Sequence, residues 1–113
     1  MHEFYLATEV IRIAEREAEK AVAISIQEIT IEVGDLSGVE ADAFETALGL
    51  LSRDSVLDKS RIRIIRTPGK GKCKACNYEF EMNQRMATCP KCRAFPSEVH
   101  GGQEFRVLSL EIE

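Results

Sequence analysis

Cys73-Lys-Ala-Cys76 and Cys89-Pro-Lys-Cys92 are two C-x₂-C pairs, separated by twelve residues, and they contain all 4 cysteines of the chain. Two such pairs bring four thiolates to the corners of a tetrahedron, the geometry and donor set that Zn²⁺ prefers. A closed shell of four cysteines leaves no open coordination position, so we expect structural and not catalytic zinc. Iron also suits tetrahedral sulfur, and redox disulfides or free thiols are the remaining alternatives.

Two glycine-containing stretches enclose the cysteines. Residues 67–72 have the composition of a linker, and Gly101-Gly102 marks a second one. The segment between them has too few apolar side chains to build a core without a metal. We therefore predict a zinc-binding domain, a zinc ribbon, over residues 70–102.

The last apolar stretch, residues 105–112, predicts a strand that is too short to fold alone. We expect it to return to the sheet of the N-terminal part. The ribbon is then an insertion in one α/β domain made of residues 1–69 and 103–113. The apolar pattern breaks between Val107 and Leu108, which indicates a bulge or burial on both faces.

Hydrophobic periodicity upstream of the cysteines predicts two helices and two strands. Apolar spacing favours an amphipathic helix over 5–22, and alternation over 27–34 favours a half-buried strand. The stretch 37–40, Ser-Gly-Val-Glu, fits a capping box, and apolar residues at helical spacing follow over 44–51. Residues 61–66 predict another strand. The fold class is therefore α+β, with two helices packed on a small, about three-stranded mixed sheet and an inserted Cys₄ zinc-ribbon domain.

The composition is that of an ordinary globular protein, with 113 residues, of which 44% are hydrophobic and 30% charged. No apolar run approaches the roughly 20 residues that a membrane span needs. The opening Met1-His2-Glu3 lacks a basic region, so we expect no secretory signal. These features predict a cytoplasmic protein that binds no membrane.

The net charge of −4 is unevenly distributed. Residues 67–103 carry six Lys or Arg against three Glu, a net charge of +3, and the rest of the chain carries −7. An acidic body argues against a dedicated nucleic-acid binder. The basic insert, with Tyr78, Phe80 and Phe95 to stack on bases, supports the alternative function of a zinc-ribbon module for nucleic acid or a transcription complex.

The N-terminus offers several nitrogen donors close together. His2 follows the initiator, whose removal requires a small second residue, so we expect Met1 to be retained. The terminal amine, a peptide nitrogen and the imidazole can close chelate rings, and nitrogen-rich square-planar sites favour Ni(II) or Cu(II). Glu3 adds a carboxylate or a backbone nitrogen. The alternative is a frayed terminus with no ligand role.

Glu40 has two interpretations. It completes the capping box with Ser37, or it supplies a further oxygen if the start of the second helix lies near the N-terminus.

Enzyme chemistry has little support in this sequence. No catalytic triad, P-loop or glycine-rich phosphate cradle is present, and nothing marks Asp35, Glu40 or Asp42 as a general acid–base pair. We expect a protein that is not an enzyme. A rubredoxin-like electron carrier is a further hypothesis, because iron shares the cysteine pattern.

Several features together resemble the HypA/HybF family of nickel metallochaperones, which mature nickel–iron hydrogenases. The matching pieces are the opening Met1-His2-Glu3, the stretch from Ile31 to Glu40, the two C-x₂-C pairs and the closing stretch from Gly102 to Glu113. They cover essentially the whole chain in order.

The resemblance implies a nickel-binding α/β body with a zinc-ribbon insert. It implies that His2 is the essential nickel ligand, helped by the terminal amine of Met1, nearby backbone nitrogens and Glu3. Some members have an Asp implicated in function at the position of Glu40. The implied zinc ligands are Cys73, Cys76, Cys89 and Cys92.

The resemblance also implies partners. Similar proteins exchange nickel with the GTPase HypB, and the final acceptor is the precursor of the hydrogenase large subunit. In some organisms the family also serves urease maturation. Ni²⁺ is then the transported ion and Zn²⁺ the structural one, with no nucleic acid involved.

The strand expected at 61–66 would invite a homodimer as an exposed edge.

Overall fold

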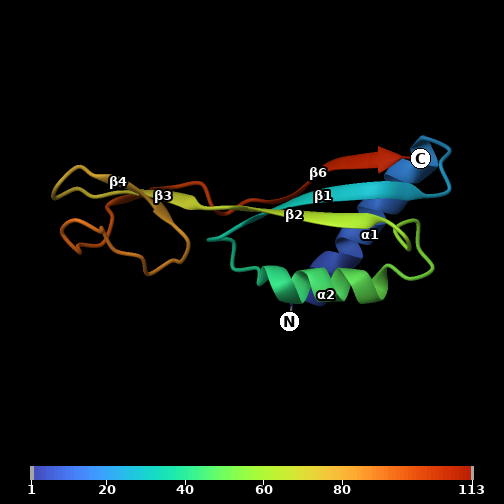
Figure 1. Ribbon diagram of the computed structural model, residues 1–113, viewed down its shortest axis with the longest axis horizontal. Helices are drawn as coiled ribbons and strands as arrows, with labels where there is room; N and C mark the ends of the chain where they lie inside the picture. Colours follow the sequence, from blue (N-terminus) through green and yellow to red (C-terminus); the bar gives the residue numbers. More distant parts are fainter. Residues whose placement is uncertain (1, 113) are drawn as a thin grey trace.

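The computed structural model describes residues 2–112, so Met1, a predicted nickel ligand, lies outside the described residues. In chain order the elements are α1 (His2–Lys20), β1 (Ile26–Gly34), α2 (Ala41–Leu51), β2 (Arg61–Thr67), β3 (Gly69–Lys72), β4 (Glu79–Met82), β5 (Glu98–His100) and β6 (Phe105–Ile112). The strands form two sheets at opposite ends of an elongated molecule that measures 55 × 25 × 17 Å (Figure 1).

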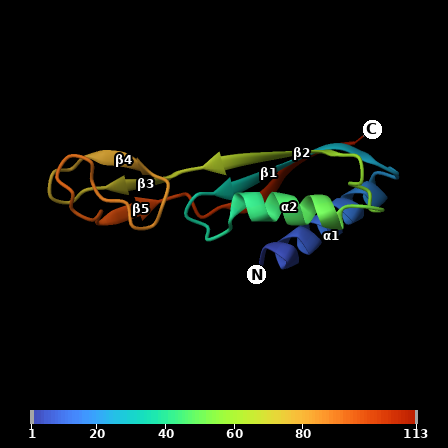
Figure 2. The same ribbon diagram turned by 60° about the horizontal axis from the view of Figure 1, so that its bottom comes forward.

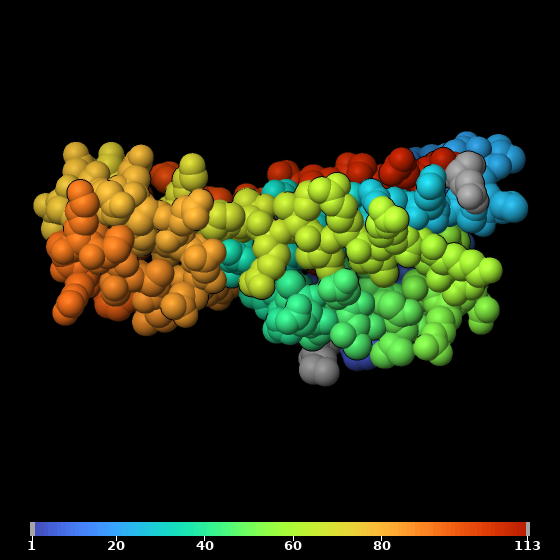
Figure 3. Space-filling model, in the orientation of Figure 1, coloured from blue at the N-terminus to red at the C-terminus, as the bar shows by residue number. Residues whose placement is uncertain are grey.

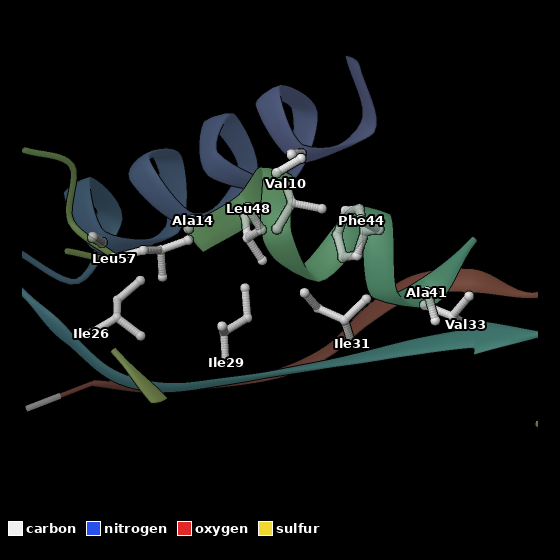
Figure 4. Packing of buried hydrophobic residues seen from close by; sticks show 13 residues of the cluster. Val10, Ala14, Ile26, Ile29, Ile31, Val33, Ala41, Phe44, Leu48 and Leu57 are labelled. Carbon is white, nitrogen blue, oxygen red and sulfur yellow. The ribbon is translucent and has the colours of Figure 1, made fainter. Parts of the chain in front are cut away.

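The first sheet is mixed and has three strands in the order β2-β1-β6. The central strand β1 runs parallel to β2 and antiparallel to β6. Both helices lie on the same face of this sheet (Figure 4). The predicted α+β class is therefore confirmed, with two helices on a three-stranded mixed sheet and an insert that contains the cysteines.

Alternation along β1 determines which side chains enter the core. Ile29, Ile31 and Val33 are at most 1% exposed and point toward the helices. Phe44 and Leu48 of α2 cover them from above, as Figure 4 shows. Burial of these large apolar side chains is the main favourable contribution to folding of this sheet.

Helix α1 packs through a narrow stripe of small side chains. Its buried apolar positions are Ala7, Val10, Ala14 and Ala18. This spacing places them on one face, and their small size allows α2 to approach closely. The helix ends earlier than the predicted residue 22, because Val22 adopts φ 53° and the Ala23 N–H returns to the Ala18 carbonyl at 2.8 Å.

The capping box predicted from Ser37 to Glu40 is wrong. Helix α2 begins at Ala41, and Glu40 is its N-cap residue. The Glu40 carboxylate accepts the N–H of Asp42 at 3.3 Å and the N–H of Ala43 at 3.0 Å. Ser37 makes only a local turn with the backbone N–H two residues on. The motif matched on its Ser-x-x-Glu spacing, but the helix begins one turn later than the motif requires.

Strand β6 returns to the first sheet beside β1, as predicted. Thr30 of β1 lies opposite Ser109. The next residue of β1 lies opposite Val107, so Leu108 is the extra residue of a β-bulge. The bulge that the broken apolar pattern indicated is confirmed.

The predicted linker over 67–72 is partly a strand. Strand β3 covers Gly69–Lys72 and is the centre of the second sheet, between β4 and β5 (Figure 2). Composition misled here because this strand needs glycine for space. A Cβ on Gly71 would lie 2.7 Å from the Met82 sulfur and 3.0 Å from the Phe80 ring.

Glycines allow the two sheets to meet backbone to backbone. A Cβ on Gly34 would lie 2.1 Å from the carbonyl oxygen of Gly102, whose φ is 80°. The Gly34 N–H donates to the Glu104 carbonyl, and the Leu36 N–H donates to the Gly102 carbonyl, both at 2.6 Å. Leu36 is 3% exposed and packs over Gly69. The joint is therefore a packed contact and not an open linker.

Asp35 adds a polar bridge across this joint. Its carboxylate, 6% exposed, accepts Arg66 Nε at 3.1 Å and Asn83 Nδ2 at 2.7 Å. Arg66 belongs to β2 of the first sheet, whereas Asn83 follows β4 of the second. Arg85 donates to the Leu36 carbonyl at 3.3 Å from the same side. Figure 3 shows the larger body and the smaller lobe that these contacts connect.

Two predictions about organisation stay open. The division into 1–69 with 103–113 and 70–102 remains a prediction. Strand β2 does lie at an edge of its sheet, but the homodimer remains a prediction. Among residues 2–112, no helix has the length and apolar character required to span a bilayer.

Gly34→Ala tests the close contact at the joint. We expect it to lower the free energy of unfolding by about 2–3 kcal/mol, because the new methyl group overlaps the backbone of Gly102. Gly49→Ala in α2 is the matched control, since nothing lies within 4 Å of its Cβ, and it should stabilise by about 0.5–1 kcal/mol. Urea unfolding measures both variants, and equal changes in their free energies of unfolding would contradict the packed joint.

Candidate metal centres

Both cysteine pairs fold into the same local turn, which we call a knuckle. In the first, the Cys73 N–H donates to the Tyr78 carbonyl at 2.9 Å, and the Asn77 N–H donates to the Cys73 carbonyl at 2.7 Å. The second knuckle repeats both bonds, at 2.8 and 2.7 Å, from the N–H groups of Cys89 and Arg93. The repeated sequence pattern thus produces a repeated backbone conformation.

The residue after each second cysteine has a left-handed backbone. The φ angle is 63° at Asn77 and 65° at Arg93. Asparagine adopts this region more readily than other residues with a Cβ, so arginine is the more strained of the two.

The four sulfur atoms are close enough to share one ion. All Sγ atoms lie within 4.8 Å of one another. The Cys73–Cys92 and Cys76–Cys89 distances are 3.2 and 3.5 Å. A tetrahedral zinc site with bonds of about 2.3 Å has edges of about 3.8 Å, so these thiols fit one Zn²⁺ after small adjustments. The same tetrahedron suits iron.

Backbone N–H groups lower the pKa of the two buried thiols. At Cys73 the N–H of Cys76 has the largest effect, and the thiol of Cys92 adds to it. At Cys89 burial raises the pKa, but the N–H groups of Cys92 and Lys91 outweigh it and lower the pKa to about 7. Both sulfurs are therefore disposed to become thiolates, the form that binds a metal.

The two exposed cysteines have raised pKa values. At Cys76 the N–H of Tyr78 lowers the pKa, but desolvation of the sulfur and the neighbouring thiols outweigh it. At Cys92 the N–H of Ala94 lowers the pKa, but the hydrogen bond with Cys73 and desolvation outweigh it and raise it to about 12. Adjacent thiolates repel one another, so a divalent cation is needed before all four deprotonate.

The predicted nickel ligands lie on the body that contains the first sheet, where α1 begins beside the start of α2 (Figure 2). His2 is the first residue of α1, and its side chain is 55% exposed. Glu3 is only 9% exposed, and its Oε2 accepts the backbone N–H of Glu40 at 3.2 Å. Nδ1 of His2 lies 3.8 Å from the same oxygen. The structure thus brings His2 and Glu3 to the start of α2.

The contacts of Glu3 keep it ionised. The N–H of Glu40 is the largest cause that lowers the pKa of Glu3 below its ordinary 4.5, followed by the N–H of Glu3 itself. Burial opposes this shift, and the charges of His2 and the terminal amine assist it.

The side chain of Glu40 is not part of this group, because both its oxygens accept bonds in the first turn of α2. Within residues 2–112, the four cysteines are the only cluster of three or more His, Cys, Asp or Glu ligand atoms that could hold a metal. Nickel ligation by His2, Glu3 and Glu40 remains a prediction.

Sequence reasoning missed the structural role of Glu3, which joins the first turn of α1 to the start of α2. A signal was present, because Glu3 lies four residues before Ala7 and so continues the buried stripe of α1. An acidic residue on a buried stripe requires a hydrogen-bond donor.

Arg93→Gly tests the left-handed turn of the second knuckle. We expect it to raise the free energy of unfolding by about 1 kcal/mol, because glycine adopts this φ without steric cost. Asn77→Gly is the matched control in the first knuckle and should gain only a few tenths of a kcal/mol. Denaturant unfolding of metal-loaded protein measures both variants. A lower free energy of unfolding for Arg93→Gly would contradict a left-handed backbone at this residue.

Glu3→Gln tests the bond between the two helices through its pH dependence. The pKa of Glu3 is lowered in the folded state, so its stabilising contribution is complete above about pH 4.5 and is lost as the pH falls through the folded value. We expect the variant to be less stable at neutral pH, with the difference from the parent chain shrinking in acid. Unfolding curves over this pH range measure it, and a difference independent of pH would contradict it.

Comparisons with known proteins agree with this arrangement. The family model described as "Hydrogenase/urease nickel incorporation, metallochaperone, hypA" matches residues 1–112. The chain is 38% identical over 113 residues to hydrogenase maturation factor HypA of Geobacter metallireducens, with all of both chains covered. It is 36% identical over 110 residues to the protein of the same name in Francisella philomiragia, with 97% of each chain covered.

Solved structures give the same result. The solution structure of the Ni metallochaperone HypA from Helicobacter pylori matches with a TM-score of 0.65 and 27% identity, and the match covers 99% of this chain and 97% of that one. A second solution structure of a HypA protein matches with a TM-score of 0.67 and 27% identity, covering 100% and 97%. The chain therefore belongs to the HypA family of nickel metallochaperones of hydrogenase maturation, whose members are carriers and not enzymes.

Proposed function

We propose that this chain binds one Ni²⁺ at its N-terminus, through His2 with the terminal amine, backbone nitrogens and Glu3, and passes it to the precursor of a hydrogenase large subunit. A GTPase of the HypB type assists the transfer. The observation that carries the proposal is the exposed imidazole of His2 beside the buried, ionised carboxylate of Glu3 at the free end of α1.

The position of His2 suits a site that must both bind and release. The first four N–H groups of a helix have no partner within the helix, so backbone nitrogens at the start of α1 lose little when they bind a metal. Nitrogen donors favour Ni²⁺ in a square-planar arrangement. A terminal site also leaves coordination positions open to an incoming ligand of the acceptor.

Besides contributing to the nickel site, Glu3 also positions His2 in this proposal. Its Oε2 is held by the Glu40 N–H at 3.2 Å, so the first turn of α1 has a fixed place against α2. This bond orients His2 for nickel, and the carboxylate supplies negative charge 3.8 Å from Nδ1. Glu40 contributes its backbone, and we assign its side chain to the helix cap.

The four cysteines hold a structural Zn²⁺ in this proposal. The ion would offset half of the negative charge of the four thiolates and join the two knuckles, which have few apolar side chains of their own. Thiolate ligation fits a reducing compartment, and we propose the cytoplasm. The family description includes urease, so a urease maturation system is the second client to test.

His2→Ala tests the nickel site. The parent and the variant are titrated with Ni²⁺ as zinc-loaded chains without an N-terminal tag, since a tag would block the terminal amine. We expect one Ni²⁺ per parent chain and at least about 100-fold weaker binding by the variant, because a direct ligand contributes more than an outer partner does. Zinc content should stay at one ion per chain in both.

His100→Ala is the matched control. His100 is the other histidine of the chain, lies on β5 in the second sheet and has a 74% exposed side chain. The His100→Ala variant should bind nickel as the parent does. Equal binding by His2→Ala and the parent, or loss of zinc together with nickel, would contradict two separate sites.

A further inference from the structure

The positive charge of the second sheet is concentrated at its cysteine end. Strand pairing places Lys70 opposite Glu81, and it places Lys72 between Glu79 and Glu98. These are the three carboxylates of residues 67–103, so the acidic side chains of this segment all lie beside the two sheet lysines.

The remaining cations of this segment divide between two places. Arg85 is engaged at the joint, where it donates to the Leu36 carbonyl. Lys74, Lys91 and Arg93 are exposed on the knuckles. None of these three forms an ion pair with a carboxylate in the part of the chain that the structure describes. Each is the sequence neighbour of a cysteine or lies between two, so all three surround one cluster.

An aromatic stack holds one of these cations in place. Lys91 Nζ lies 4.4 Å from the centre of the Tyr78 ring. The Tyr78 ring in turn stacks on Phe80, with centroids 6.4 Å apart and planes 13° from parallel. A cation over an aromatic face is attracted by the negative charge on the face of the ring. The knuckle end therefore presents fixed positive charge beside an apolar face, with Tyr78 36% exposed.

The rest of the molecule has the opposite charge. The body carries −7 against +3 for residues 67–103, and the two sheets lie at opposite ends of a 55 Å molecule (Figure 1). A zinc ion on four thiolates has a formal charge of −2, which the three knuckle cations more than offset. An acidic surface is thus attracted to one end of the chain and repelled by the other.

We propose that the knuckle surface, made of Lys74, Lys91, Arg93 and Tyr78, docks an acidic patch with apolar side chains on the protein that receives nickel. This rests on the proposed delivery function. The docking orients the chain along its long axis, and a protein patch fits better than nucleic acid, because the acidic body would repel a continuous phosphate backbone.

The test is binding of the zinc-loaded chain to the nickel-free hydrogenase large-subunit precursor. The variant is Lys91→Glu with Arg93→Glu. The control is Arg53→Glu with Lys59→Glu, which makes the same charge change at two exposed body residues. We expect at least about tenfold weaker binding for the knuckle variant and less than about twofold for the control, with a difference that shrinks as salt is added.

Arg93→Gly is the second variant. It removes a knuckle cation and relaxes the left-handed backbone, so it should bind the precursor more weakly although it is more stable. Weaker binding by a more stable protein separates docking from unfolding. Zinc content is measured for every variant, and zinc loss from both knuckle variants would assign the cations to the cluster and overturn the proposal.

Three further outcomes would overturn the proposal. The first is equal binding of the precursor by the knuckle and body variants. The others are that the parent chain binds a single-stranded DNA of about 20 nucleotides, or associates with itself, and that the knuckle variant loses this binding. Nickel titration of the same samples separates this inference from the proposed function. If the chain binds nickel at His2 but the knuckle variant binds the precursor as the parent does, only the docking surface is refuted. If the chain binds no nickel at His2, the delivery function is refuted.

Discussion

The contact between the backbones of Gly34 and Gly102 is the constraint on which the two-sheet arrangement depends. Strand β1 is the centre of the first sheet, so the chain must leave by β2 and return by β6 on its other side. The end of β1 lies between the outgoing segment after β2 and the returning segment before β6, where the backbones are too close for a side chain. Leu36 and Asp35, directly after the strand, then contact the second sheet. These polar and apolar contacts thus fix the joint, although its glycine content alone indicates a flexible linker.

The segment from Asp35 to Glu40 links the second sheet to the N-terminal turn of α1. At one end it accepts hydrogen bonds from Asn83 and Arg85, which precede the second knuckle. At the other end its last residue donates to Glu3, next to His2. The same residue caps α2, so one short loop sets the start of a helix, the place of the N-terminal turn and the attachment of the second sheet.

Local patterns in the sequence predicted most of the fold. The cysteine spacing, the stripe of α1 and the alternation of β1 depend on neighbours in the chain, and the structure contains each of them. Strand β3 could not be predicted, because its glycines are explained by side chains distant in sequence or across the sheet: Leu36 lies over Gly69, and Met82 and Phe80 lie over Gly71. The cap of α2 was misplaced because Ser37 is a favoured N-cap residue and Glu40 is not, although Glu40 caps the helix. At the candidate nickel site the residues could be named, but the bond from Glu40 to Glu3 joins residues far apart in sequence.

The strand order also constrains how the protein folds. Strand β6 pairs with β1 but follows the whole second sheet in the chain, so the first sheet cannot close until the cysteine segment has been synthesised. A metal that joins the knuckles shortens the flexible path between β2 and β6 and lowers the entropy cost of closing it. If the four cysteines bind their metal during synthesis, its supply would influence the rate at which the body is completed, although the cysteines lie outside its core.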